Sequence, residues 1–227
     1  MHIEPGVVDG AKILLSVGTA GVACALTVKA IIDTLRSDGV SALMTRTLMT
    51  TLLVFLSFEV LWHHPVGVSE VHLIMGSTLF LLFGAAPTAL GLTLGLLIQG
   101  IFFAPTDLPQ FGMNLTSLLL PLFAMSVVAR QIVKPSTAYV DLSYRQTLKL
   151  SLVFQGGVVA WVAFWTLYGQ GITATNLEGL ASFAAAYSIV ILIEPALDLG
   201  VLGIAKHVHN KNVRALFATR LTVANAT

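Results

Sequence analysis

Long apolar runs recur along the whole chain and are separated by short breaks that contain proline, glycine or charged residues. A helix needs roughly 20 mostly apolar residues to cross the hydrocarbon core of a bilayer, or about 17 at the short end. Only helices and closed barrels satisfy their backbone groups in lipid, and no alternation of apolar and polar residues suggests barrel strands. The sequence therefore predicts an all-α, polytopic membrane protein with seven transmembrane helices, over residues 11–33, 42–62, 70–84, 87–104, 112–133, 146–168 and 179–205.

The composition agrees with this class of protein. Of the 227 residues, 56% are hydrophobic and 10% are charged, whereas soluble domains carry about a quarter charged residues. The net charge of +1 gives no indication of a nucleic-acid partner. The single cysteine, Cys24, excludes a disulfide framework, and no cleavable signal peptide is visible, so we expect Met1 to be the mature N-terminus.

The distribution of Lys and Arg predicts the orientation, since cytoplasmic loops carry an excess of basic residues. With the N-terminus outside, the inner side holds eleven of the twelve basic residues, and Lys12 remains on the outer side. We therefore expect the N-terminus outside and the C-terminus inside. The chain would be a single transmembrane domain, 1–227, with an N-terminal loop (1–10), a seven-helix bundle (11–205) and a basic cytoplasmic tail (206–227).

This orientation brings four of the six histidines to the outer face. The third predicted segment has only about 15 residues, or roughly 22 Å of helix, against about 30 Å of hydrocarbon. One of its ends must therefore lie below the membrane surface. If that end is the outer one, His72 lines a recessed pocket, with Ser69 and Glu70 just before it in the chain.

The opening Met1-His2 is a candidate metal chelate. A free amine at Met1, the amide nitrogen of residue 2 and the imidazole of His2 can close two adjacent chelate rings, which leaves one position in the plane for His72. Four nitrogens in a plane suit Ni(II) or Cu(II), and low-spin Co(II), better than Zn(II) or Mg(II). Pro5 and Gly6 supply a turn that would fold residues 1–10 back as a metal-binding loop.

The histidines could instead have purely structural roles. An N-terminal histidine is usually solvated, and a histidine at a helix entrance often forms a cap or a hydrogen bond. His63 and His64 follow Trp62, which is a normal position at the membrane interface, yet they are rival ligands. Glu59, about one turn before His63, could hold an imidazole proton or simply end a helix near the interface.

Two acidic residues lie inside the last predicted segment. Glu194 and Asp198 stand four residues apart and therefore share one face of a helix. Intramembrane carboxylates are often functional, so this pair could be a coupling or proton site; alternatively, both residues hydrogen-bond to neighbouring helices. Gln99 and Gln155 are expected to be interhelical hydrogen-bond partners.

Catalytic motifs are absent from the sequence. It holds no G-x-x-x-x-G-K-[ST] phosphate loop, no serine–histidine–acid set and no H-E-x-x-H helix. We therefore expect a binding or transport protein, not an enzyme, whose energy for transport would come from other chains.

Two stretches resemble the CbiM/NikM family, the substrate-binding membrane subunits of energy-coupling-factor cobalt and nickel importers. The opening "MHIEPG" is similar to the M-H-I-P-D-G of that family, with E-P in place of P-D. The second stretch resembles family blocks G-T-S-G-H-L-x-G-G, LLIQ-x-x-FF and G-A-N, although S-E-V-H is one residue longer than S-G-H. It reads "PVGVSEVHLIMGSTLFLLFGAAPTALGLTLGLLIQGIFFAPTDLPQFGMN".

The resemblance implies a ligand set. Met1 and His2 would bind metal through the amine, the amide and the imidazole, and His72, at the start of the third helix, would be the fourth ligand. Asn114, which matches the asparagine of G-A-N, would line the pocket or support the ligands, as would Ser69 and Glu70.

The resemblance also implies a function. The chain would be the substrate-specific subunit of an ATP-driven importer for Co²⁺ or Ni²⁺, without another cofactor, in a bacterial inner membrane. Its partners would be a transmembrane coupling subunit, ATPase subunits and a small accessory membrane subunit, besides membrane lipid and without nucleic acid. Two other functions remain open: a proton-coupled carrier that works alone through Glu194 and Asp198, and a membrane scaffold or sensor that transports nothing.

Overall fold

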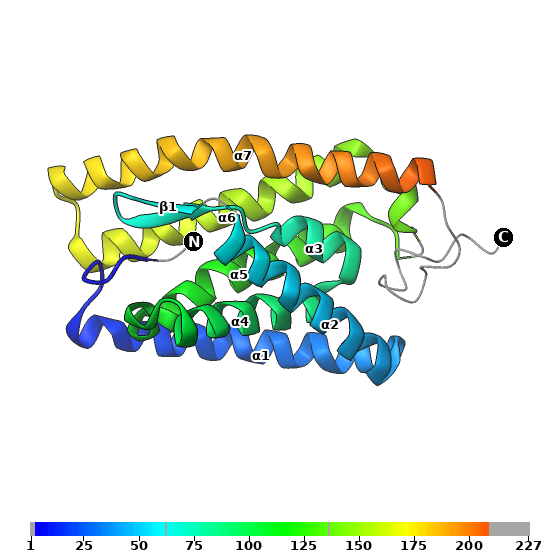
Figure 1. The fold of residues 1–227 in the computed structure, drawn as a ribbon, viewed down its shortest axis with the longest axis horizontal. Helices are drawn as coiled ribbons and strands as arrows, with labels where there is room; N and C mark the ends of the chain where they lie inside the picture. The colour runs from blue at the N-terminus through cyan, green and yellow to red at the C-terminus, as the bar shows by residue number, and fades with distance from the viewer. Residues whose placement is uncertain (1–2, 62, 136, 209–227) are drawn as a thin grey trace.

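The computed structural model describes residues 3–61, 63–135 and 137–208, and within these ranges the chain is mostly helical (Figure 1). The elements follow in this order: η1 (Gly10–Ile13), α1 (Leu14–Ser37), α2 (Gly39–Phe55), η2 (Leu56–Val60), β1 (His63–Val66), β2 (Ser69–His72), α3 (Gly76–Phe83), α4 (Ala85–Phe102), η3 (Pro105–Gln110), α5 (Phe111–Ile132), η4 (Tyr139–Asp141), α6 (Tyr144–Gln170) and α7 (Ala174–Val208).

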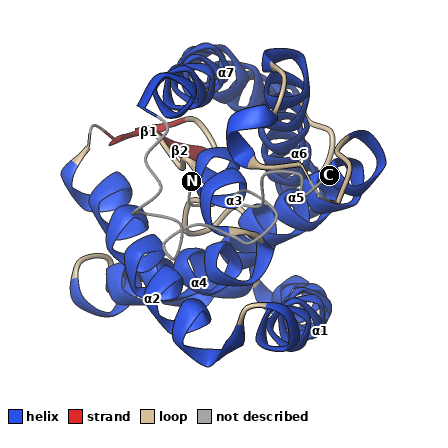
Figure 2. Cartoon of the chain, turned by 90° about the vertical axis from the view of Figure 1, so that its right-hand side faces the viewer, coloured by secondary structure: helices blue, strands red, loops and turns tan. Residues whose placement is uncertain are grey.

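The long helices form a bundle around the short helix α3. Helix α2 packs on α4, α5 packs on α6, and α6 packs on α7. Helices α1 and α7 lie on opposite sides of the bundle in both views, and α3 lies near its centre (Figures 1 and 2). Helices α1 and α7 also run in the same direction, from the end that holds η1 to the end where α7 stops (Figure 1).

Six helical segments of the described residues are long and apolar enough to cross a membrane: 10–37, 39–60, 85–102, 105–132, 144–170 and 174–207. Their outward faces carry exposed apolar side chains such as Leu14, Leu48 and Leu192. An apolar exterior of this extent fits contact with lipid. The structure thus confirms a polytopic helical membrane protein.

The third predicted segment, 70–84, is not one helix, so this prediction is wrong. Its first residues form strand β2, which pairs antiparallel with β1 in a register that places His63 opposite His72. The two strands are joined by a two-residue loop in which Gly67 has a φ of 63°, the positive value that such loops favour at their first position. Within the described residues, the fold is therefore all-α except for this hairpin and one isolated bridge between Ile3 and Ser69.

Helix α3 follows the hairpin after a three-residue linker. It has eight residues, so it is about 12 Å long. The prediction failed because a short apolar run is compatible with either a helix or a strand, and residues 63–66 provide a strand partner in register. The predicted helix 42–62 is present as α2 and η2, residues 39–60, and ends two residues earlier than predicted, before β1 begins at His63.

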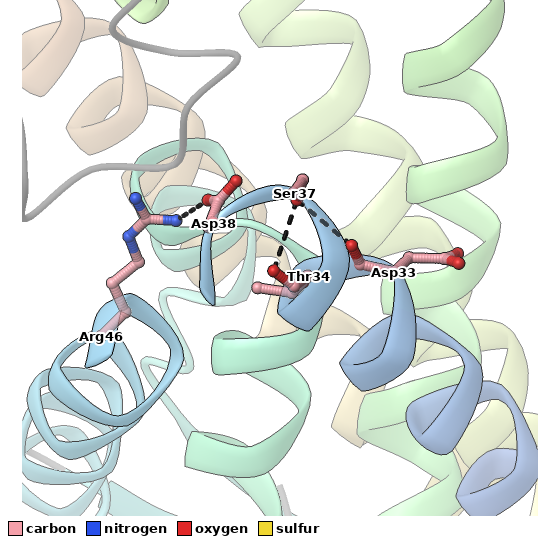
Figure 3. A network of polar contacts seen from close by, with 5 residues as sticks. All are labelled: Asp33, Thr34, Ser37, Asp38 and Arg46. Carbon is pink, nitrogen blue, oxygen red and sulfur yellow. Dashed lines mark hydrogen bonds and ion pairs between the residues drawn. The ribbon is translucent and has the colours of Figure 1, made fainter. Parts of the chain in front are cut away.

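The connection between α1 and α2 is held by a nearly buried ion pair between Asp38 and Arg46 (Figure 3). Their side chains are only 7% and 4% exposed, respectively. The hydroxyl of Ser37 donates to the carbonyl oxygens of Asp33 and Thr34, which closes the last turn of α1. Such a pair is costly to break, because removing one partner leaves the other charge buried.

Candidate metal site

The first described residues are docked against the hairpin and α5. Ile3 is fully buried, and its N–H donates to Oδ1 of Asn114 at 2.7 Å. Ile3 also forms an isolated antiparallel bridge with Ser69, and the N–H of Glu4 donates to the carbonyl oxygen of Val68 at 3.2 Å. The segment therefore lies beside β2 like a short third strand. The predicted ligands Met1 and His2 lie outside the described residues.

His72 is the last residue of β2, whereas the sequence predicts it near the start of a helix over 70–84. Its side chain is 1% exposed, and its ring meets the ring of Phe58 edge-on with centroids 4.6 Å apart. Nδ1 of His72 lies 3.2 Å from the carbonyl oxygen of Leu73. The structure thus places this imidazole in the interior, next to the end of α2 and η2.

The two rival histidines occupy different positions on β1. His63 lies directly opposite His72, and residues that oppose each other in an antiparallel pair share one face of the sheet. Nδ1 of His63 lies 3.0 Å from the carbonyl oxygen of Phe58 and 3.7 Å from Oε1 of Glu70. His64 pairs with Val71 and is therefore on the other face, where it is exposed.

A cavity of about 270 Å³ lies beside Ile3 and the hairpin. Four carboxylates from four separate segments line it, and His63 and Gln99 join them. The lining residues are Ile3, Glu4, Glu59, His63, Pro65, Glu70, Gln99, Phe103, Ala104 and Asp107. We call this cavity the acidic pocket.

Electrostatic repulsion within the acidic pocket is visible at Glu4. Burial, followed by the charges of Asp107 and Glu70, raises the pKa of Glu4 above its ordinary value. Among the described residues, however, no group of three His, Cys, Asp or Glu side chains converges closely enough to hold a metal ion. The acidic pocket can therefore attract a cation, but its own side chains do not form a coordination cage in this arrangement.

Gln99 connects α4 to the acidic pocket. Its side chain is 4% exposed and lines this pocket together with Glu59. The interhelical hydrogen bond expected for Gln99 stays a prediction. Sequence reasoning did not identify Glu4 or Asp107 as pocket residues. No local motif marks either residue, because only the tertiary fold brings η3 next to the N-terminal segment.

Glu194 and Asp198 do not line the acidic pocket but approach the segment that follows His72. Oε1 of Glu194 accepts the N–H groups of Ile74 and Met75, the latter at 2.9 Å. Asp198 accepts the hydroxyl groups of two residues in the first turn of α3, Ser77 at 2.6 Å and Thr78. Both residues therefore hydrogen-bond to neighbouring segments, which is one of the two roles predicted for this pair.

Gln155 connects Glu194 to α6. Its Nε2 group donates to Oε2 of Glu194, and its Oε1 accepts the hydroxyl of Tyr187 at 2.5 Å. All three side chains are buried. The interhelical role predicted for Gln155 agrees with these contacts.

The fold and the site together define a class: a polytopic helical membrane protein with a buried histidine on an internal hairpin and an acidic pocket beside its N-terminal segment. The chain belongs to the CbiM family, described as the cobalt uptake substrate-specific transmembrane region, which it matches over residues 2–211. It is therefore a membrane component of metal transport.

Comparison with solved structures supports the same fold. A structure described as a transition metal transporter superposes with a TM-score of 0.66 at 18% identity, covering 97% of this chain and 99% of that one. A truncated transition metal transporter gives a TM-score of 0.65 at 15% identity, covering 91% and 97%. No curated protein matches the chain.

Proposed function

We propose that this chain is the substrate-specific subunit of an ATP-driven energy-coupling-factor importer, and that it captures Co²⁺ or Ni²⁺ on the outer face of a bacterial inner membrane. The observation that carries the proposal is the docking of Ile3 onto Asn114 and Ser69. This contact holds the beginning of the chain beside the strand that bears His72.

The length of chain before Ile3 would allow the proposed N-terminal chelate to reach His72. His2 precedes Ile3 by one Cα step of about 3.8 Å, and Met1 precedes it by two steps. Ser69, the bridge partner of Ile3, lies three residues before His72 on β2, or about 10 Å at the rise of a strand. Because the bridge is antiparallel, a strand continued from Ile3 toward the N-terminus would run along β2 from Ser69 toward His72.

The chemistry of this set favours a transition metal. The amine, the amide nitrogen and the imidazole of Met1-His2 supply three nitrogens, and Nε2 of His72 would supply the fourth. Four nitrogens in a plane suit Ni(II) and low-spin Co(II). The negative charge of the acidic pocket also supports the proposal, because clustered carboxylates raise the local concentration of a divalent cation.

The topology is compatible with an outer N-terminus. Helices α1 and α7 run in the same direction (Figure 1), as expected when an odd number of passages alternates between them. Residues 69–83, which comprise β2 and α3, would then form the third membrane-spanning segment, partly extended and partly helical. The excess of basic residues at the opposite side supports the assignment of that side to the cytoplasm.

Energy for transport would come from other chains. The sequence has no phosphate loop, so ATPase subunits and a transmembrane coupling subunit would be required, and a small accessory membrane subunit is a further candidate. Substrate release would require these partners to separate the N-terminal chelate from His72. A carrier that works alone would instead take up metal in vesicles that lack any ATPase.

Metal analysis of the full chain tests the proposal. The protein should carry its purification tag at the C-terminus, because an N-terminal tag would convert the Met1 amine into an amide. We expect the gently purified protein to bind Ni²⁺ or Co²⁺ tightly, and we expect His2→Ala and His72→Ala each to abolish tight binding. His63→Ala serves as the control and should change it little.

Two outcomes would contradict this assignment. If His63→Ala abolished binding and His72→Ala did not, the ligand would lie on β1. If neither metal bound at all, a scaffold or sensor would be the better description.

A further inference from the structure

Glu194 and Asp198 of α7 both contact the chain just after His72. Glu194 accepts two backbone N–H groups, those of Ile74 and Met75, and Asp198 accepts side-chain hydroxyl groups at the start of α3. Both carboxylates are 1% exposed. Two acidic side chains on one helix face thus bind the end of the connection between β2 and α3 and the first turn of α3.

This connection has little support from regular secondary structure. The first N–H groups of a helix have no partner within the helix, and an unpaired backbone group is costly in a membrane interior. Met75, a non-glycine residue, has a φ of 56° where the chain turns from the strand into the helix. Glu194 therefore supplies hydrogen bonds that neither the hairpin nor α3 provides.

Helix α7 also contacts the opposite end of the hairpin. A Cβ atom added at Gly67 would lie 2.3 Å from the carbonyl oxygen of Gly179, so the loop of the hairpin rests directly on α7. Gly179 and Glu194 are fifteen residues apart, or about 22 Å along the helix. The loop of the hairpin and the chain that follows β2 are thus both attached to the same helix, α7.

We propose that Glu194 and Asp198 are positioning residues for His72, which they hold in place by fixing the backbone between β2 and α3 to α7. This inference rests on the proposed function, since it assumes that His72 binds the metal. Residues that orient a metal ligand typically change metal affinity by about 10- to 100-fold when they are replaced. The carboxylates of α7 would act in this way although they do not touch the ion.

Glu194→Ala in the full chain, with a C-terminal tag, is the direct test. Ni²⁺ affinity should fall by about 10- to 100-fold, and the ligand-field absorption of the Ni(II) complex should shift to lower energy, toward that of His72→Ala. Glu194→Gln should restore most of the affinity, because its amide oxygen can still accept the two N–H groups. Glu178→Ala is the matched control, an exposed carboxylate of α7 whose removal should change neither quantity.

A double variant separates positioning from general damage to the fold. When His72 is already alanine, Glu194→Ala should cause no further loss of residual Ni²⁺ binding, because both changes act through one imidazole. An equal further loss would overturn the proposal, and so would wild-type affinity and absorption in the Glu194→Ala single variant.

A milder variant covers the case in which Glu194→Ala does not fold. Thr78→Val removes a hydroxyl that Asp198 accepts and should weaken binding in the same direction with the same spectral shift. Unchanged binding in Thr78→Val would contradict the role of Asp198. If the unmodified protein bound neither Ni²⁺ nor Co²⁺, the proposed function itself would be wrong, and the positioning role would fall with it.

Discussion

The hydrogen bond between Ile3 and Asn114 gives the sharpest prediction about metal capture. Asn114 is 1% exposed on α5, and its Oδ1 accepts the N–H of the first described residue at 2.7 Å. Asn114→Leu keeps a side chain of similar size but removes the acceptor. The N–H of Ile3 would then remain buried without this partner, and the N-terminal segment would be held less firmly beside β2.

The size of the effect follows from the lost hydrogen bond. Leaving a buried N–H unpaired costs about 1–3 kcal/mol. If this whole cost falls on the docked state that binds metal, the apparent Kd rises by about 5- to 150-fold, since 1.4 kcal/mol corresponds to a factor of ten. The contact between Glu4 and Val68 persists, so we expect weakened and not abolished binding.

The measurement is a Ni²⁺ titration in competition with a chelator of known affinity, on protein with a free N-terminus. Asn114→Asp is the matched control, because its carboxylate retains an oxygen that can accept the N–H of Ile3, and it should bind more tightly than Asn114→Leu. Hydrogen exchange of residues 3–8 should accelerate in Asn114→Leu. A folded Asn114→Leu protein that binds Ni²⁺ as tightly as the unmodified chain would refute the reasoning.

Three further predictions concern the N-terminus, the acidic pocket and the first helical connection. Two residues added before Met1 should lower Ni²⁺ affinity steeply, because the terminal amine becomes an amide; equal affinity by titration would exclude the amine as a ligand. Burial and two neighbouring carboxylates raise the pKa of Glu4 above 4.5, so the folded chain binds this proton more tightly than the unfolded chain and stability falls as pH rises above 4.5. Glu4→Gln should therefore raise the thermal unfolding midpoint at pH 7 but not at pH 4, and an unchanged midpoint at pH 7 would contradict this. Asp38→Ala should destabilise the protein by about 3–5 kcal/mol, because it leaves Arg46 buried without its partner; a denaturant titration that shows less than about 1 kcal/mol would mean that water reaches this pair.

The helical bundle was predictable because lipid leaves the backbone few options. The six candidate spans correspond to six of the predicted segments, with ends that differ by a few residues. The third segment was not predictable from hydrophobicity, since β2 has only four residues and lies directly before the apolar run that continues through α3. Gly67 between two valines was the available signal, because a glycine at the first position of a two-residue loop is typical of a hairpin.

The site was predictable only in part. The resemblance marked Asn114 as a pocket residue, but only the structure gives it a partner, the N–H of Ile3. Glu194 could be recognised as an intramembrane carboxylate in the sequence, yet its two backbone partners, Ile74 and Met75, lie about 120 residues earlier in the chain and carry no motif. The assignment of Met1, His2 and His72 as metal ligands stays a prediction, which the experiments above test.

The bond from Ile3 to Asn114 spans 111 residues of chain, which has a consequence for biogenesis. Ribosomes add about 5–20 residues per second, so the leading segment waits roughly 6–22 s before its acceptor on α5 has been synthesised. In the later part of that interval His72 has already been synthesised, but Asn114, the hydrogen-bond partner of Ile3, has not. The proposed metal site would therefore be completed late, only after α5 has been synthesised.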